Sequence, residues 1–306
     1  MHSAPSFSEN TRGILLMVGA SAGFILNDTC VKLASEELTI AEIVVVRSVI
    51  ALPIIGLIGL HQGAFADRSL LAERFIWLRA VGEVTAAMLY LSALARMEIA
   101  NATAIIQLIP LAVTAAAALV LREKVGLRRW SAIAIGFAAV VLIIRPGPEG
   151  FNVWSLSALA AVGFIALRDL SSRLLPAATH PLAVTCLSLL AMIPVGLAMV
   201  PFSGWAPLTT RGLILCAASG LLLSAGLVMV TQAMRHGEIG VVSPFRYSLL
   251  LMAIVVQIVV FSTWPDALTL VGSAILVATG LYTLYRERRV KADPTPAARR
   301  PAAYPP

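Results

Sequence analysis

Ten apolar segments follow one another along this chain of 306 residues, and each is about as long as a helix that crosses a bilayer. A hydrocarbon core of about 30 Å needs about 20 residues of helix. Because lipid offers no partner to a backbone N–H or C=O, a spanning segment must satisfy these groups itself, which favours α-helix. The sequence therefore predicts an all-α polytopic membrane protein with spans at 13–34, 40–60, 75–95, 100–121, 129–144, 153–172, 181–200, 212–234, 240–261 and 267–285.

The composition agrees with this class. Hydrophobic residues make up 59% of the chain and charged residues 13%, whereas soluble domains carry about 25% charged residues. The net charge is +7, but the basic residues form no patch interleaved with aromatic residues, so no nucleic-acid partner is expected. Cys30, Cys186 and Cys216 lie within apolar segments without the spacing of metal ligands, so no metal or cofactor is expected.

The chain also repeats itself at an offset of 140 residues. Residues 93–99 read ALARMEI, and residues 233–239 read AMRHGEI. This repeat predicts a duplicated unit, with one copy at 13–145 and the other at 153–285. Five spans in each copy is an odd number, so the second copy is expected to sit inverted in the membrane. Inverted repeats are typical of secondary transporters, whose substrate site lies between the repeats.

The basic residues predict the orientation. With both termini in the cytoplasm, 17 of the 23 lysines and arginines fall on the cytoplasmic side and four on the other side. The remaining two, Arg47 and Arg246, lie within spans. An excess of Lys and Arg marks cytoplasmic loops, so both termini are predicted to be cytoplasmic. The segment 286–306 is basic and rich in Pro and Ala, and we expect a disordered tail against an anionic membrane surface.

Two motifs that suggest enzymes do not fit this arrangement. Gly19-Ala20-Ser21-Ala22-Gly23 matches the G-x-S-x-G pattern of hydrolases, but that pattern needs a strand before the serine and a converging histidine. Here the serine lies inside a predicted span, and small residues at this spacing allow close helix packing. The four histidines lie at span ends or in loops, and no phosphate-binding G-x-x-x-x-G-K-[ST] loop is present. The chain is therefore not expected to be an enzyme.

The first two spans place opposite charges at matching depths. Lys32 and Glu42 are about equally far from the turn between the spans, and Asp28 and Arg47 are both about two turns deeper. Ionisable groups in lipid are costly and usually face a partner or a cavity. The pattern predicts two ion pairs, which either staple the two helices together or form an outer gate and substrate clamp.

A second charged cluster, Arg168 and Asp169, is predicted near the cytoplasmic end of the sixth span. By the repeat offset, Arg168 corresponds to Asp28. An inverted repeat would place the two clusters at opposite mouths of a pathway, as alternating access requires. The alternative is that Arg168 extends to the lipid headgroups. The predicted gating residues are thus Lys32, Glu42, Arg47, Arg168 and Asp169.

Deeper polar residues predict a central pocket. Glu83 and Arg246 lie well inside the third and ninth spans and either face one another across a cavity or form a structural ion pair. Aromatic and amide side chains at similar depth suit a small polar or heteroaromatic metabolite, although such residues also serve packing. The predicted substrate-binding residues are Asn27, Asp28, Glu83, Tyr90, Gln107, Arg246 and Tyr247.

The first copy also carries a family resemblance. The residues that carry it are Ile99-Ala100-Asn101-Ala102, Pro110, Glu123-Lys124 and Trp130. Together with the five-plus-five organisation, they resemble the EamA type of the drug/metabolite transporter superfamily, which commonly has a proline midway along the fourth helix of each half and a glutamate after it. The second copy departs from this pattern, with Leu250 and Thr263 at the corresponding positions.

The resemblance implies a monomeric or homodimeric carrier in the inner membrane of a bacterium, which moves a small metabolite by alternating access. The stretch Pro244-Phe245-Arg246-Tyr247-Ser248 looks most similar to bacterial riboflavin transporters, so riboflavin uptake is the first expectation. Transport of amino acids or S-adenosylmethionine in either direction is the alternative. An intramembrane enzyme or a membrane scaffold without transport is a more remote one.

Overall fold

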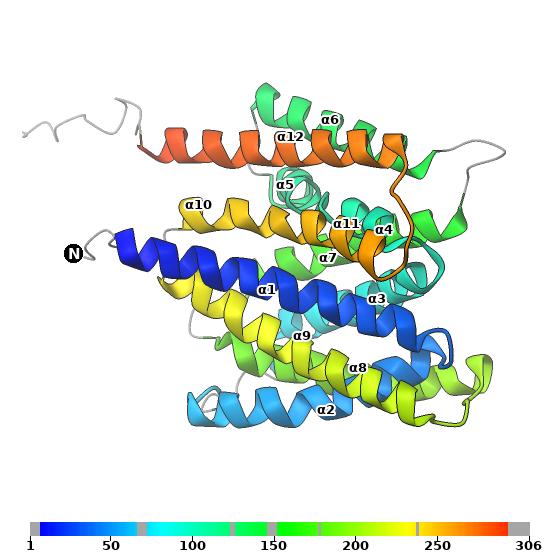
Figure 1. Ribbon diagram of the computed structural model, residues 1–306. Coiled ribbons are helices and arrows are strands. Elements are labelled where there is room, and N and C mark those ends of the chain that lie inside the picture. The colour runs from blue at the N-terminus through cyan, green and yellow to red at the C-terminus, as the bar shows by residue number, and fades with distance from the viewer. Residues whose placement is uncertain are drawn as a thin grey trace, which may run out of the picture.

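The computed structural model describes residues 7–65, 72–122, 126–145, 152–176, 179–236 and 239–292, and they form a bundle of helices (Figure 1). The helices are α1 (Phe7–Ala34), α2 (Ile40–His61), α3 (Arg74–Arg96), α4 (Ile99–Ile106), α5 (Ile109–Val120), α6 (Leu127–Ile144), α7 (Val153–Arg173), α8 (Pro181–Ser203), α9 (Thr210–His236), α10 (Ile239–Val242), η2 (Ser243–Tyr247), α11 (Ser248–Val259) and α12 (Ala267–Ala292).

All ten predicted segments are helical, which confirms the all-α prediction and the helix count. Within the described residues, eight segments are long and apolar enough to cross a membrane, and α4 with α5 counts as one of them. The other two, 243–259 and 267–283, are shorter apolar helices. Helix α12 continues beyond the predicted span to Ala292, and the rest of the predicted tail lies outside the described residues, as does Glu123.

Two of the ten spans are interrupted. In the first half, α4 ends at Ile106, and α5 starts again at Ile109 with Pro110 in its first turn. In the second half, the 3-10 helix η2, with Pro244 in its first turn, separates α10 from α11. A proline cannot donate a backbone hydrogen bond, so it is tolerated where a helix begins again. The repeat offset carries Gln107 onto Tyr247, so the two interruptions are at equivalent positions.

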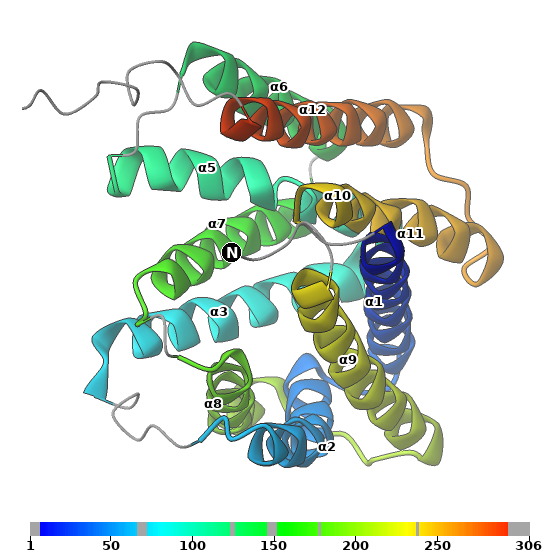
Figure 2. The same cartoon turned by 90° about the vertical axis from the view of Figure 1, so that its left-hand side faces the viewer.

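Helices from the two halves pair across the bundle. Helix α1 packs along α9, α3 along α7, α2 along α8, and α6 along α12, while α4 contacts α11 (Figure 2). Small residues allow the closest approaches. A Cβ at Gly82 of α3 would lie 3.0 Å from the carbonyl oxygen of Phe164 in α7, and one at Gly23 of α1 would lie 3.3 Å from the carbonyl oxygen of Leu222 in α9.

The bundle has two ends, which we name by what they carry. The turn end carries the α1–α2 turn and the starts of α4, α7, α9 and α12. The termini end carries the start of α1 and the end of α12, which lie on the same side of the bundle (Figure 1). An even number of spans between the two termini requires this placement.

Candidate functional site

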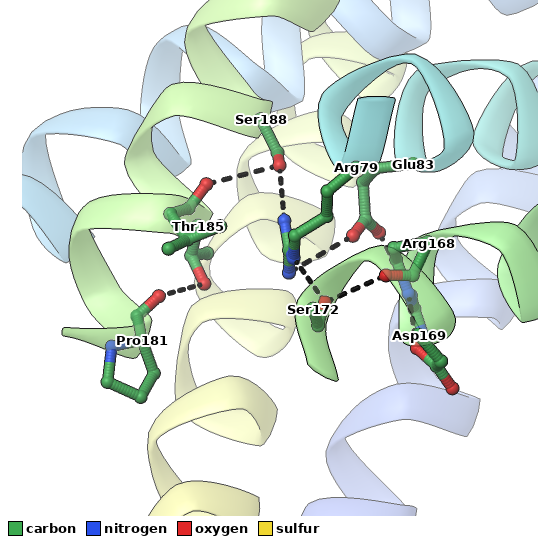
Figure 3. Close-up of polar contacts among 9 residues, drawn as sticks. Arg79, Glu83, Arg168, Asp169, Ser172, Pro181, Thr185 and Ser188 are labelled. Carbon is green, nitrogen blue, oxygen red and sulfur yellow. Dashed lines mark hydrogen bonds and ion pairs between the residues drawn. The ribbon is translucent and has the colours of Figure 1, made fainter. Parts of the chain in front are cut away.

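Charged side chains meet between α3 and α7 near the termini end (Figure 3). Arg168 lies 3.2 Å from Oε1 of Glu83 and 2.8 Å from Oδ1 of Asp169. Arg79, one helical turn before Glu83, lies 3.5 Å from the other oxygen of the same carboxylate. These four side chains form the α3–α7 cluster, in which Glu83 is shared by two arginines.

Arg79 extends the α3–α7 cluster to a third helix. Its Nε donates to Ser172 of α7 at 2.9 Å, and its Nη1 donates to Ser188 of α8 at 2.8 Å (Figure 3). From the sequence, Arg79 was counted only among the 17 basic residues on the cytoplasmic side, and neither serine was named. The signal was present, because Arg79 and Glu83 are four residues apart and so lie on one face of a helix.

Arg246 was predicted to face Glu83, and the structure does not pair them. Glu83 is occupied by Arg79 and Arg168, and Arg246 has no ion pair within 4.0 Å among the described residues. Its side chain is exposed, although Arg168 and Asp169 of α7 are the charges that act on it most strongly. Arg246 therefore lies near the α3–α7 cluster without an ion pair to it.

Asp28 belongs to a buried network that joins α1, α3 and α9. Tyr90 donates to one carboxylate oxygen at 2.7 Å, and the amide of Asn27 donates to the other at 2.9 Å. Ser219 donates to the Asn27 oxygen at 2.7 Å. The structure thus brings together three predicted residues, Asn27, Asp28 and Tyr90. Ser219 was missed, because the sequence does not show which face α9 turns toward α1.

Arg47 is close enough to Asp28 for their charges to interact, but the predicted ion pair between them is not formed. The side chain of Arg47 is 5% exposed, and its Nε has no hydrogen-bond partner in the described structure. Both oxygens of Asp28 are already engaged by neutral donors.

The predicted pair of Lys32 and Glu42 is wrong. The Lys32 ammonium donates to the backbone carbonyls of Leu94 and Met97 at the end of α3, and it lies 5.7 Å from the centre of the Phe261 ring. Glu42 instead accepts from the backbone and side chain of Thr39 and caps the start of α2. Carbonyls at a helix C-terminus lack partners within the helix and attract cations, which explains why Lys32 turns toward α3.

In the part of the chain that the structure describes, the two helix interruptions hold polar atoms without a hydrogen-bond partner. Gln107, 6% exposed, has an unpaired Nε2 at the first interruption, and the hydroxyls of Ser243 and Ser248 are unpaired at the second. Tyr247 was predicted to bind substrate, but its hydroxyl is packed against Gly280 of α12, where a Cβ would lie only 1.6 Å away. Tyr247 therefore holds η2 against α12. The two serines were missed, because unwinding of the span was not expected.

The turn end is tied by other contacts. Gln257 of α11 accepts from the backbone N–H of Ala100 at 2.9 Å and donates to Glu98 at 2.8 Å. Arg211 of α9 lies 3.1 Å from Glu36 and 2.6 Å from Glu37 in the α1–α2 turn. Hydrogen bonds from Thr209 and Arg211 hold the pKa of Glu37 below its ordinary value.

A cavity of about 270 Å³ also opens at the turn end, between the α3–α4 connection and the start of α12. Arg96, Glu98 and Arg145 line it together with Asp266, which pairs with Arg145. Its charges have partners, so it offers less to a ligand than the interrupted helices do. In the part of the chain that the structure describes, no three His, Cys, Asp or Glu side chains gather as a metal site would require.

These features define a class: a multi-pass membrane protein with interrupted spans and charged groups between its helices, as in transporters. Residues 11–145 match the EamA-like transporter family. This match and the curated relatives named as transporters of the drug/metabolite transporter superfamily confirm the resemblance that the sequence predicted. The family and the relatives of the chain are transporters and not enzymes.

Several curated proteins are similar over much of the chain. A riboflavin transporter of Vibrio cholerae serotype O1 is 26% identical over 87% of this chain and 90% of its own. A pseudopaline exporter, CntI, of Pseudomonas aeruginosa is 28% identical over 87% of this chain and 93% of its own. An S-adenosylmethionine uptake transporter of Rickettsia felis is 26% identical over 62% of this chain and 65% of its own. A solved crystal structure shares the fold, with a TM-score of 0.64 over 92% of this chain and 99% of the other, at 16% identity.

Proposed function

We propose that this protein is a secondary transporter that moves a small metabolite across a bacterial inner membrane by alternating access. One observation carries the proposal. Arg246 is an exposed arginine at the helix interruption η2, and the charges of Arg168 and Asp169 on α7 act on it. A membrane protein that served only as a scaffold would gain nothing from an uncompensated charge between its helices.

The helix pairing supports an inverted repeat. Exchange of the two halves turns α1 into α7 and α3 into α9, so the pair α1–α9 becomes α7–α3, which is also observed. The pairs α2–α8 and α6–α12 each become themselves, and the pair α5–α7 becomes α11–α1, which is also observed. This pattern is that of a two-fold relation between the segments 13–145 and 153–285. With five spans in each half, the two-fold axis lies in the plane of the membrane.

The distribution of basic residues supports a cytoplasmic termini end, so the turn end faces outward. Lys32 then forms part of the outer gate, where it links α1 to the end of α3. Arg168 and Asp169 form part of the inner gate, and Arg79 joins them through Glu83. Glu42 supports the outer gate indirectly, because it caps α2 beside the turn.

The substrate is proposed to bind between the gates. Asp28 with its partners Asn27 and Tyr90 lies on one side, and Arg246 with the unpaired Gln107 amide marks the helix interruptions. Arg47 lies near enough to interact with the charges of Asp28 and Glu83, and it pairs with neither. It is therefore proposed to change partners as the pathway opens and closes.

Riboflavin is the substrate that the sequence resemblance and the Vibrio cholerae relative suggest first. The Rickettsia felis relative supports a second candidate, S-adenosylmethionine. The experiment that tests the transporter proposal is uptake of radiolabelled riboflavin and S-adenosylmethionine, each alone, by liposomes that contain the purified protein. Uptake that saturates and falls at least about tenfold in the Asp28→Asn variant supports the proposal. Absence of flux for both compounds and for a panel of amino acids, with folded protein, contradicts it.

A further inference from the structure

The charges near the α3–α7 cluster do not balance. Arg79, Arg168 and Arg246 act on one another or on shared neighbours, and they face two acids, Glu83 and Asp169. Arg79 and Arg168 both reach Glu83, and Arg168 also reaches Asp169. Arg47 also acts on Glu83, but its charge is balanced by that of Asp28. One positive charge is therefore left over, and of these three arginines Arg246 is the one without an ion pair among the described residues.

Arg79 and Arg168 have hydrogen-bond or ion-pair partners among the described residues, and Arg246 has none. Arg79 donates to two serine hydroxyls besides its carboxylate, and the side chains of Arg79 and Arg168 are only 15% and 22% exposed. Arg246 has neither a hydroxyl nor a carboxylate partner in the described structure, and its side chain is exposed. Its planar guanidinium, with parallel N–H donors, is free to form a bidentate pair with an oxyanion.

A second, independent observation, made at the helix interruptions, also indicates a ligand. Gln107 is more than nine-tenths buried, and its amide nitrogen has no acceptor among the described residues. It lies at the interruption that corresponds to the one carrying Arg246, where the Ser243 and Ser248 hydroxyls are unpaired as well. Buried polar groups are normally satisfied, and three of the eight unpaired ones in the described structure lie at these two equivalent interruptions, where a ligand would supply the partners.

We infer that Arg246 binds a carboxylate of the transported substrate, and this inference rests on the proposed transport function. A single negative charge neutralises the one positive charge left over in the cluster, which favours a carboxylate over a doubly charged phosphate. The unpaired amide and hydroxyls then contact the polar remainder of the substrate. This assignment separates the candidate substrates, because S-adenosylmethionine carries a carboxylate and riboflavin carries no ionised acid at neutral pH.

A matched pair of compounds tests the inference. S-adenosylmethionine and its decarboxylated form differ only in the carboxylate, and each is offered as a radiolabelled substrate to liposomes that contain the full-length protein. Three variants are compared with the native chain: Arg246→Gln, Arg246→Lys and the charge-matched control Arg12→Gln, at an exposed position of α1. Riboflavin uptake is measured in parallel with the same proteins.

The inference predicts that the decarboxylated compound is taken up at least about tenfold less well than S-adenosylmethionine. Arg246→Gln is expected to raise the KM for S-adenosylmethionine at least about tenfold, whereas Arg246→Lys retains part of the affinity and Arg12→Gln changes nothing. Equal uptake of the two compounds, or uptake of riboflavin alone with no effect of Arg246→Gln, overturns the inference and leaves the transporter proposal intact. Absence of flux for every compound contradicts the transporter proposal itself.

Discussion

The turn end and the termini end of the bundle are held by different kinds of contact. At the turn end, Lys32 links α1 to α3, Gln257 links α11 to α4, and Arg211 links α9 to the α1–α2 turn. At the termini end, the α3–α7 cluster and its serine partners join α3, α7 and α8, on one side of the bundle (Figure 2). These contacts tie the turn end across the bundle, whereas the α3–α7 cluster ties neighbouring helices.

The two ends also differ in exposure. The side chains of Arg79, Glu83 and Arg168 are 15–24% exposed, whereas Arg211 and Glu36 are more than half exposed. Removal of one partner from a partly buried ion pair lowers the free energy of unfolding strongly, because the other charge is left without compensation. Exposed ion pairs contribute little to the free energy of unfolding. Substitutions at the termini end are therefore expected to have larger effects than matched substitutions at the turn end.

The largest effect is expected for Gly82→Leu. Gly82 lets α3 approach the backbone of α7 beside Arg168, and a larger side chain forces the helices apart at a cost of about 1–3 kcal/mol. Separation of α3 from α7 also disrupts the α3–α7 cluster, so transport is expected to be lost. The matched control is Gly163→Leu on α7, where a Cβ meets nothing within 4 Å. Thermal unfolding and liposome uptake measure both variants, and an equal loss in both would contradict the role given to Gly82.

Glu83→Gln is expected to have the next largest effect. It leaves Arg79 and Arg168 without their shared counter-charge, at a cost of about 1–3 kcal/mol, between the values for exposed and fully buried pairs. The control at the turn end is Glu36→Gln, for which no measurable change in unfolding is expected because the side chain is exposed. A larger loss of stability in Glu36→Gln than in Glu83→Gln would reverse the comparison between the ends.

Lys32→Met is expected to act on the conformation more than on the fold. The variant leaves the carbonyls of Leu94 and Met97 without their donor, a loss of about 1–3 kcal/mol from the closed turn end. The population is expected to shift toward a state that is open outward. Spin labels at Glu36 and Ser262 measure the separation of α1 and α11 at this end, and an unchanged distance distribution would remove Lys32 from the gate.

The smallest effect is expected from protonation of Glu37. Thr209 and Arg211 hold its pKa below the ordinary value, so the contact is fully present above the ordinary pKa of a glutamate and is lost as the pH falls through the lowered one. The distance between spin labels on the α1–α2 turn and at the start of α9 is expected to stay constant from neutral pH down to the ordinary glutamate range and to widen only in more acid solution. Arg211→Gln moves this transition to higher pH. A transition near neutral pH would show that another group controls the turn end.

The sequence predicted the helices well and the partners of their charged residues poorly. Long apolar runs leave helix as the only way to satisfy the backbone in lipid, so the spans from Ile40 and Val153 begin where they were predicted. The depth of a residue also follows from counting along a helix. Its direction around the helix does not, and this is why Lys32 and Glu42 lie at similar depth without pairing.

The interruption at Gln107 shows a second limit. Pro110 marks a point where a helix can restart, but many spans contain a proline and remain continuous, as α2 does at Pro53. Whether the helix unwinds depends on neighbours that pack against the freed backbone, and these come from distant parts of the chain. The cluster around Glu83 was missed in part for the same reason, since Ser188 reaches Arg79 from a helix more than one hundred residues later.

The pairing of helices across the two halves has a consequence for biosynthesis. Because α1 packs along α9 and α3 along α7, the first five spans lack their main packing partners until the second half has been translated and inserted. A ribosome that stops after α6 would leave in the bilayer a fragment whose small-residue faces, such as the one around Gly23, have nothing to contact. The two halves, expressed as separate chains in one cell, would instead find each other and restore the bundle, because their mutual surfaces are larger than those within either half.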